Sequence, residues 1–120
     1  MSKKTVIIGA STNPERYAYR AAVALKSKGH EAVSVGLKSG EVNGIKVLDG
    51  KPEIKDVDTV TLYVGPANQP YWYDYILSLK PERVVFNPGT ENDEFEDLLR
   101  KNNIEPVEAC TLVMLSIGNY

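Results

Sequence analysis

Short runs of branched apolar residues alternate along this chain with segments in which apolar residues recur every three or four positions. The first run, residues 6–8, is followed by a helical pattern over residues 18–25 and by a second run at residues 32–35. Branched runs of this length predict buried strands, and the spacing of three or four predicts a helix with one apolar face. The opening of the chain therefore predicts a β-α-β unit.

The same alternation continues to the end of the chain. Further strands are expected at residues 59–64, 84–86 and 105–107, and helices at residues 72–79, at residues 92–102 and from residue 111 onward. Residues 40–56, rich in glycine and charge, predict a loop with one very short strand. The order predicts an α/β fold: a Rossmann-like, doubly wound three-layer sandwich with a mostly parallel five-stranded sheet.

Length and charge narrow the classes of function. The 120 residues make a single domain, 1–120, too short for a nucleotide domain plus a substrate domain, so a catalytic partner would come from another protein. A formal charge of −2 with scattered lysines favours neither nucleic acid nor an anionic membrane. With no apolar run of roughly 20 residues and no signal-peptide pattern, a cytoplasmic protein is expected.

The single cysteine and single histidine exclude several kinds of site. Cys110 has no second cysteine for an internal disulfide, and with His30 alone it cannot form a typical zinc site, so no metal is expected. His30 precedes a predicted strand and therefore lies at the amino edge of the sheet. Ligands of doubly wound sheets bind at the carboxyl edge, so His30 cannot form a catalytic pair there.

Four loops are expected at that carboxyl edge: residues 9–13, 36–40, 64–69 and 87–92. Each contains glycine, proline, asparagine or serine, residues that let a backbone approach a ligand closely. In the first loop a strand leads through small residues into a helix predicted to begin near Glu15, an arrangement suited to binding a phosphate. It falls short of G-x-G-x-x-G, because only the first glycine is present.

Two basic residues refine the choice of nucleotide. The second strand ends at Lys38 and lacks the acidic residue that binds the ribose of NAD, which leaves NADP or coenzyme A (CoA). The alternative for Lys38 is an ordinary lysine exposed to solvent in a loop. Arg16 falls in the predicted first helical turn, where a cation is unfavourable unless an anion such as a phosphate is near. For Arg16 the alternative is an exposed pair with a carboxylate.

Four segments together resemble the small, free-standing CoA-binding domain proteins over nearly the whole chain. They are Val6-Ile-Ile-Gly9-Ala-Ser-x-Asn13-Pro, Val64-Gly-Pro66, Asn87-Pro-Gly89-Thr-Glu-Asn92 and Glu108-Ala-Cys110. The family is also similar to the N-terminal CoA-binding domain of the succinyl-CoA synthetase alpha subunit. The resemblance implies a Rossmann-like sheet that holds CoA at the carboxyl ends of its strands.

Carried over by position, the resemblance places the pyrophosphate near residues 9–11, the 3′-phosphate near residues 38 and 39, and the adenine near residues 64–66. Cys110 would lie toward the pantetheine end, or else be a small buried residue. The full set expected to bind CoA is Gly9, Ala10, Ser11, Asn13, Arg16, Lys38, Ser39, Val64, Gly65, Pro66, Asn87, Gly89 and Cys110.

Other side chains have structural interpretations. On the predicted second helix, Trp72 and Tyr75 face inward as core, whereas Tyr71 and Tyr73 are candidates for ligand or interface contacts. The acidic run 91–97 is typical of the start of a helix, which Thr90 or Asn92 can cap. This structural interpretation is favoured over a catalytic one.

Two hypotheses follow from this pattern. The first is a CoA or acyl-CoA binding module without catalysis of its own, because no acid, base and nucleophile come together. It would act as a homo-oligomer or beside an acyl-CoA enzyme. The second is a small FMN-binding redox protein, with residues 9–13 around the phosphate and tyrosines around the flavin.

Overall fold

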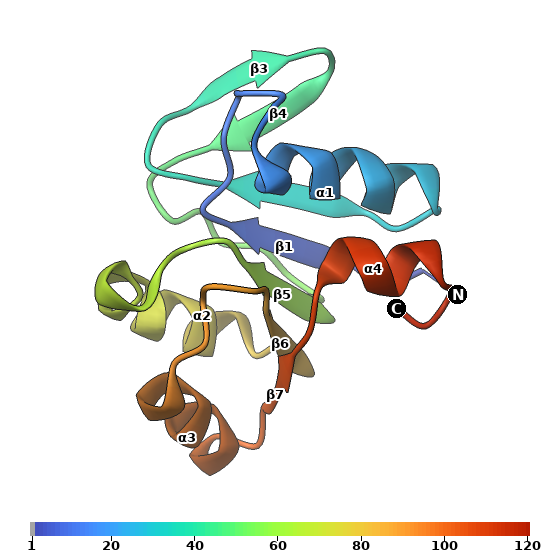
Figure 1. Ribbon diagram of the computed structural model, residues 1–120. Coiled ribbons are helices and arrows are strands. Elements are labelled where there is room, and N and C mark those ends of the chain that lie inside the picture. The colour runs from blue at the N-terminus through green and yellow to red at the C-terminus, as the bar shows by residue number, and fades with distance from the viewer. Residues whose placement is uncertain (1) are drawn as a thin grey trace.

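A seven-stranded sheet forms the centre of the fold in the computed structural model, which describes residues 2–120 (Figure 1). The strands are β1 (Thr5–Ile8), β2 (Ala32–Val35), β3 (Gly40–Val42), β4 (Ile45–Leu48), β5 (Thr59–Leu62), β6 (Arg83–Phe86) and β7 (Glu105–Glu108). Their order is β3-β4-β2-β1-β5-β6-β7, and only the β3–β4 pair is antiparallel. The predicted Rossmann-like α/β class is confirmed, whereas the count of five strands is wrong.

Helices cover both faces of the sheet. They are α1 (Tyr17–Ser27), α2 (Tyr73–Leu79), α3 (Asp93–Lys101) and α4 (Thr111–Ser116), with 3₁₀ turns η1 (Pro66–Asn68) and η2 (Pro70–Trp72). Helices α1 and α4 lie side by side on one face, and α2 and α3 cover the other (Figure 1). No helix within residues 2–120 has the length and apolar character needed to cross a membrane.

The alternation of side chains along β1 explains this layering. Ile7 packs with Leu25 of α1 and Leu115 of α4, whereas Val6 and Ile8 belong to the core beneath α2 and α3. Successive residues of a strand point to opposite faces, so a run that is apolar throughout is buried on both sides. All four β1 residues are accordingly buried.

The two additional strands form a hairpin inside the segment predicted as a loop. Strands β3 and β4 are joined by Asn43 and Gly44, with φ angles of 51° and 79°. Two consecutive residues with positive φ are characteristic of the type I′ turn, which Asn-Gly strongly favours. The segment therefore contains two short strands and not the single one expected. The Asn43-Gly44 dipeptide is the sequence signal for the hairpin that joins them.

Helix α1 begins at Tyr17 rather than near Glu15. The side chain of Ser11 accepts a hydrogen bond from the Asn13 N–H, and that of Asn13 accepts one from the Glu15 N–H, each at 3.0 Å. These hydrogen bonds hold residues 11–15 in local turns, so the helix does not begin there. Arg16 is consequently the N-cap residue and not part of the first turn.

Candidate functional site

The carboxyl ends of β1 and β5 lie side by side at the point where the order of the sheet reverses. The chain runs from β1 to β2 and β4 on one side, and β5 then pairs with β1 on the other. Connections that leave neighbouring strands in opposite directions open a crevice, where doubly wound folds bind their ligands. The site is therefore expected between the loops after β1 and β5.

A groove of about 1210 Å³ lies at this edge. Its walls come from all four predicted loops, through residues 9–12, 37–39, 63–65 and 88–90, with further contributions from the start of α1 and the two 3₁₀ turns. Pockets for drug-sized ligands measure about 300–1,000 Å³. The groove can therefore accept a larger, extended molecule such as a nucleotide with a long substituent.

Most of the residues expected to bind the ligand line this groove. Those that do are Gly9, Ala10, Ser11, Arg16, Lys38, Ser39, Val64, Gly65 and Gly89. Asn13, Pro66, Asn87 and Cys110 are not among the lining residues. Residues outside that expected set also line the groove, and they include Thr12, Leu37, Tyr63, Asn68 and Thr90.

The backbone donors of the first loop are only partly free to bind a ligand. The N–H groups of Gly9 and Ala10 both donate to the carbonyl oxygen of Val35, each at 3.0 Å, so they are already paired. Within the described part of the chain, the N–H groups of Ser11 and Thr12 donate to no protein acceptor. A phosphate at this loop would therefore meet the N–H groups of Ser11 and Thr12.

Two cationic side chains are the charged groups of the groove. Arg16 and Lys38 both line it, and no aspartate or glutamate is found among the lining residues that the structure describes. Among residues 2–120, the ion pairs within 4.0 Å involve Lys4 with Glu31 and Arg100 with two acids of its own helix. Arg16 therefore lacks the carboxylate partner considered from the sequence, and both charges can face an anion.

Among its described residues, the lining also lacks histidine and carboxylates, the side chains that most often act as general bases. It contains serine, threonine and tyrosine hydroxyls, but no histidine, cysteine, aspartate or glutamate appears among its described residues. A serine or threonine becomes a nucleophile through an adjacent base. The groove is equipped to hold a ligand by hydrogen bonds and positive charge.

Tyr71 and Tyr17 are the exposed tyrosines that line the groove. Tyr71 is 59% exposed, and Lys51 from the loop after β4 contacts it. The Lys51 Nζ donates to the Tyr71 carbonyl oxygen at 2.7 Å and lies 3.8 Å from the centre of the ring. Tyr73 lies outside the groove, stacked on Phe95 with ring centres 4.2 Å apart.

Asn87 has a structural role at this edge. Its amide nitrogen donates to the Thr61 hydroxyl and the Leu62 carbonyl, both at 2.7 Å, and its amide oxygen accepts from the Thr111 N–H at 2.9 Å. The buried side chain thus joins the ends of β5 and β6 to the start of α4. Asn87 itself does not line the groove, whereas the next two residues, Pro88 and Gly89, do.

The other three residues outside the lining are also accounted for. The side chain of Asn13 is used in the turn before α1, and Pro66 begins η1. Cys110 is half-buried and is the N-cap residue of α4. Burial, and after it the Cys110 thiol, raises the pKa of the Tyr63 phenol above its usual value. Tyr63 does line the groove, and its buried hydroxyl has no hydrogen-bond partner within residues 2–120.

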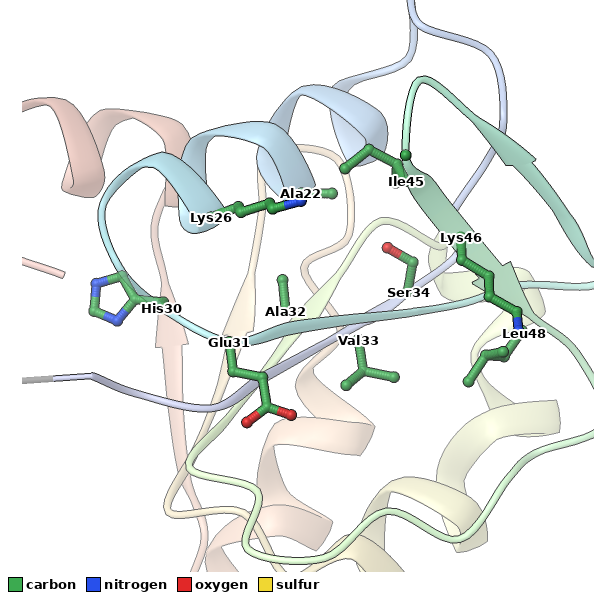
Figure 2. A pocket seen from close by; sticks show the side chains of 11 residues that line it. Ala22, Lys26, His30, Glu31, Ala32, Val33, Ser34, Ile45, Lys46 and Leu48 are labelled. Carbon is green, nitrogen blue, oxygen red and sulfur yellow. The ribbon is translucent and has the colours of Figure 1, made fainter.

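A second hollow, of about 380 Å³, lies between α1, β2 and β4 (Figure 2). Strand β4 pairs with β2 only at Ser34 and Val35, so the first half of β2 is left open on that side. His30 is at its rim, where its Nδ1 accepts from the Lys3 N–H at 2.9 Å. Burial and nearby positive charge lower the pKa of His30. None of the residues expected to bind CoA lines this hollow.

Comparisons with known proteins give one family match and several structures of similar fold. A family model described as a CoA binding domain matches residues 3–116. The crystal structure of a protein described as uncharacterized is 58% identical, with a TM-score of 0.96, and the match covers 100% of this chain and 99% of that one. No curated protein matches the chain significantly.

More distant structures share the fold. A Thermus thermophilus protein is 20% identical with a TM-score of 0.85, over 99% of this chain and 91% of that one. An acetyl-coenzyme A synthetase from Ca. Korarchaeum cryptofilum is 16% identical with a TM-score of 0.69, over 89% of this chain and 26% of that one. None of these similarities points to a flavin.

Proposed function

The chain belongs to the CoA-binding domain family, and from this premise we propose that it binds CoA or an acyl-CoA in the groove at the carboxyl edge of the sheet. The observation that carries the proposal is the charge of that groove. Its charged side chains are Arg16 and Lys38, two cations without carboxylate partners in the described structure. CoA presents a pyrophosphate and a 3′-phosphate, so two separated cations match its two anionic groups.

The pyrophosphate is assigned to the loop after β1. The N–H groups of Ser11 and Thr12 are free to donate there, and Arg16 at the start of α1 supplies the positive charge. The 3′-phosphate is assigned to Lys38 and Ser39 in the loop after β2. The distinction between CoA and its 3′-dephospho form would then depend on Lys38.

The adenine is assigned to the side of the groove formed by the loop after β5. Val64 and Gly65 line that side, and the exposed ring of Tyr71 lies on the 3₁₀ turn that follows. An exposed aromatic ring provides a face on which a base can stack. The contact with Lys51 fixes Tyr71 before ligand arrives, which reduces the entropy lost on binding.

The protein is proposed to act as a binding or regulatory module without catalysis of its own. The groove offers phosphate ligands and an aromatic surface, but the described residues that line it supply no acid–base pair to turn over a thioester. A reaction of the bound acyl group would need residues from a partner enzyme.

Isothermal titration calorimetry with CoA, 3′-dephospho-CoA and FMN tests the proposal. The wild-type protein should bind CoA more tightly than 3′-dephospho-CoA, and Lys38→Met should remove that difference. Lys46→Met removes the same charge from β4, beside the second hollow, and should behave like the wild type. Raising the salt should weaken CoA binding, because the Debye length falls from about 10 Å at 0.1 M to about 3 Å at 1 M.

Equal affinity for the two nucleotides would remove Lys38 from the site. Binding of FMN without binding of CoA would contradict the proposal as a whole.

A further inference from the structure

Three carboxylates from α3 and β7 come together outside the CoA groove. Asp93 is the first residue of α3, Glu96 lies three residues later on the same face, and Glu108 is the last residue of β7. One carboxylate oxygen from each lies within 4.8 Å of the other two. Because β7 is an edge strand, no further strand covers this corner of the sheet.

The central member of this acidic cluster, Glu96, is buried without full pairing. The residue is only 5% exposed. Its Oε1 faces the Arg100 Nη2 at 3.6 Å, whereas its Oε2 is buried with no hydrogen-bond partner among the described residues. A buried carboxylate oxygen without a partner costs free energy. Asp93 and Glu108 cannot satisfy it when they are ionised, because carboxylates then only accept hydrogen bonds.

We propose that Asp93, Glu96 and Glu108 bind a divalent cation of the hard class, such as Mg²⁺, Mn²⁺ or Ca²⁺. The donors are all carboxylate oxygens, which these cations prefer, and the cluster has none of the histidine or cysteine ligands typical of zinc. Glu96 supplies the buried ligand. Asp93 and Glu108 are exposed, so the rest of the coordination sphere is open to water.

A cation at this position has a structural consequence. It neutralises the repulsion of three close carboxylates and joins the first turn of α3 to the end of β7. The residues just before α3 include Gly89 and Thr90, which line the CoA groove. The cation site is nevertheless separate, because none of its three carboxylates lines that groove.

Electron paramagnetic resonance of Mn²⁺ tests the site on the ligand-free full chain. The signal of free aqueous Mn²⁺ should decrease with a stoichiometry of one ion per chain, and Mg²⁺ or Ca²⁺ should restore it. Glu108→Gln and Asp93→Asn alter exposed residues, and each should weaken Mn²⁺ binding at least tenfold while circular dichroism shows an unchanged fold.

The matched control is Glu105→Gln, which removes the same charge from an exposed residue at the other end of β7. It should bind Mn²⁺ like the wild type. Absence of stoichiometric Mn²⁺ binding at millimolar concentration would overturn the proposal. A proton shared between the carboxylates of Glu96 and Glu108 would then explain their close approach. An equal loss of Mn²⁺ affinity in Glu105→Gln and Glu108→Gln would overturn the proposal too. Mn²⁺ would then be attracted by the general negative charge of this surface and not by a specific site.

Discussion

Gly9 and Tyr63 approach each other so closely that position 9 has no room for a side chain. A Cβ on Gly9 would lie 2.8 Å from the carbonyl oxygen of Tyr63 and 2.7 Å from a methyl carbon of Val64. Gly9 also has a φ angle of +90°, which other residues rarely adopt. This glycine allows the ends of β1 and β5 to pack closely together. It therefore shapes the groove in addition to lining it.

Gly9→Ala should therefore destabilise the protein. We expect the free energy of unfolding to fall by about 1–3 kcal/mol, because the new methyl group meets backbone and the φ angle becomes strained. Urea denaturation measures the change. Gly65→Ala is the control: its φ and ψ are −62° and 155°, and its Cβ would meet no atom within 4 Å. Equal losses in the two variants would show that the contact with Tyr63 has no influence on stability.

Gly65 provides the corresponding test of ligand approach. Its backbone angles suit valine, and a side chain there would point into open space beside the groove. Gly65→Val should keep the wild-type melting temperature and lower CoA affinity at least tenfold in calorimetry, since the branched side chain takes space assigned to the nucleotide. Wild-type affinity in Gly65→Val would place the ligand away from the loop after β5.

The Asn87 side chain should contribute strongly to stability. Asn87→Ala removes three hydrogen bonds and leaves the buried Thr111 N–H without its acceptor. We expect a loss of about 2–4 kcal/mol in urea denaturation, because unsatisfied buried groups cost more than the bonds themselves contribute. Asn68→Ala, which alters an exposed asparagine on η1, should change stability by less than about 0.5 kcal/mol. A small effect at Asn87 would mean that water replaces its amide.

The sequence could predict the carboxyl-edge loops because their position follows from strand order alone. Residues of β1 and β5 are apolar or β-branched at every position, and such strands pair in parallel at the centre of a sheet. Once those strands are placed, Gly9 and Val64 must lie at the same edge. The hairpin was different, because three or four residues are too few to show alternation, and only Asn43-Gly44 marks it.

Residue type alone could not separate ligand contacts from internal ones. An asparagine in a glycine-containing loop suits a phosphate or a ribose, but the amide of Asn87 matches equally well the Thr61 hydroxyl and the Thr111 N–H. Those partners lie 26 and 24 residues away in the chain, so no local pattern reveals them. The same holds for Lys51 and Tyr71, which are brought together by the tertiary fold.

The buried carboxyl of Glu96 makes stability depend on pH in a direction opposite to that of most acids. Burial, followed by the adjacent Glu108, raises the pKa of Glu96 to about 7, although Arg100 and a backbone hydrogen bond oppose the rise. Asp93 is the other charged group at this position. Because the pKa of 4.5 in the unfolded chain is lower, the folded state binds more protons between about pH 4.5 and pH 7.

The stabilisation is therefore fully present below pH 4.5 and is lost as the pH rises through about 7. With EDTA present to remove cations, the wild-type free energy of unfolding should contain a contribution on the order of 2 kcal/mol that is lost between pH 5 and 7.5. Glu96→Gln should not show this loss. His30 contributes a pH dependence of the opposite sign, since its pKa is lowered, but it is common to both proteins. The difference between the two urea curves at each pH thus isolates Glu96. Parallel pH profiles for the wild type and Glu96→Gln would show that the buried carboxyl stays ionised, in which case an ordered water, not a proton, satisfies its second oxygen.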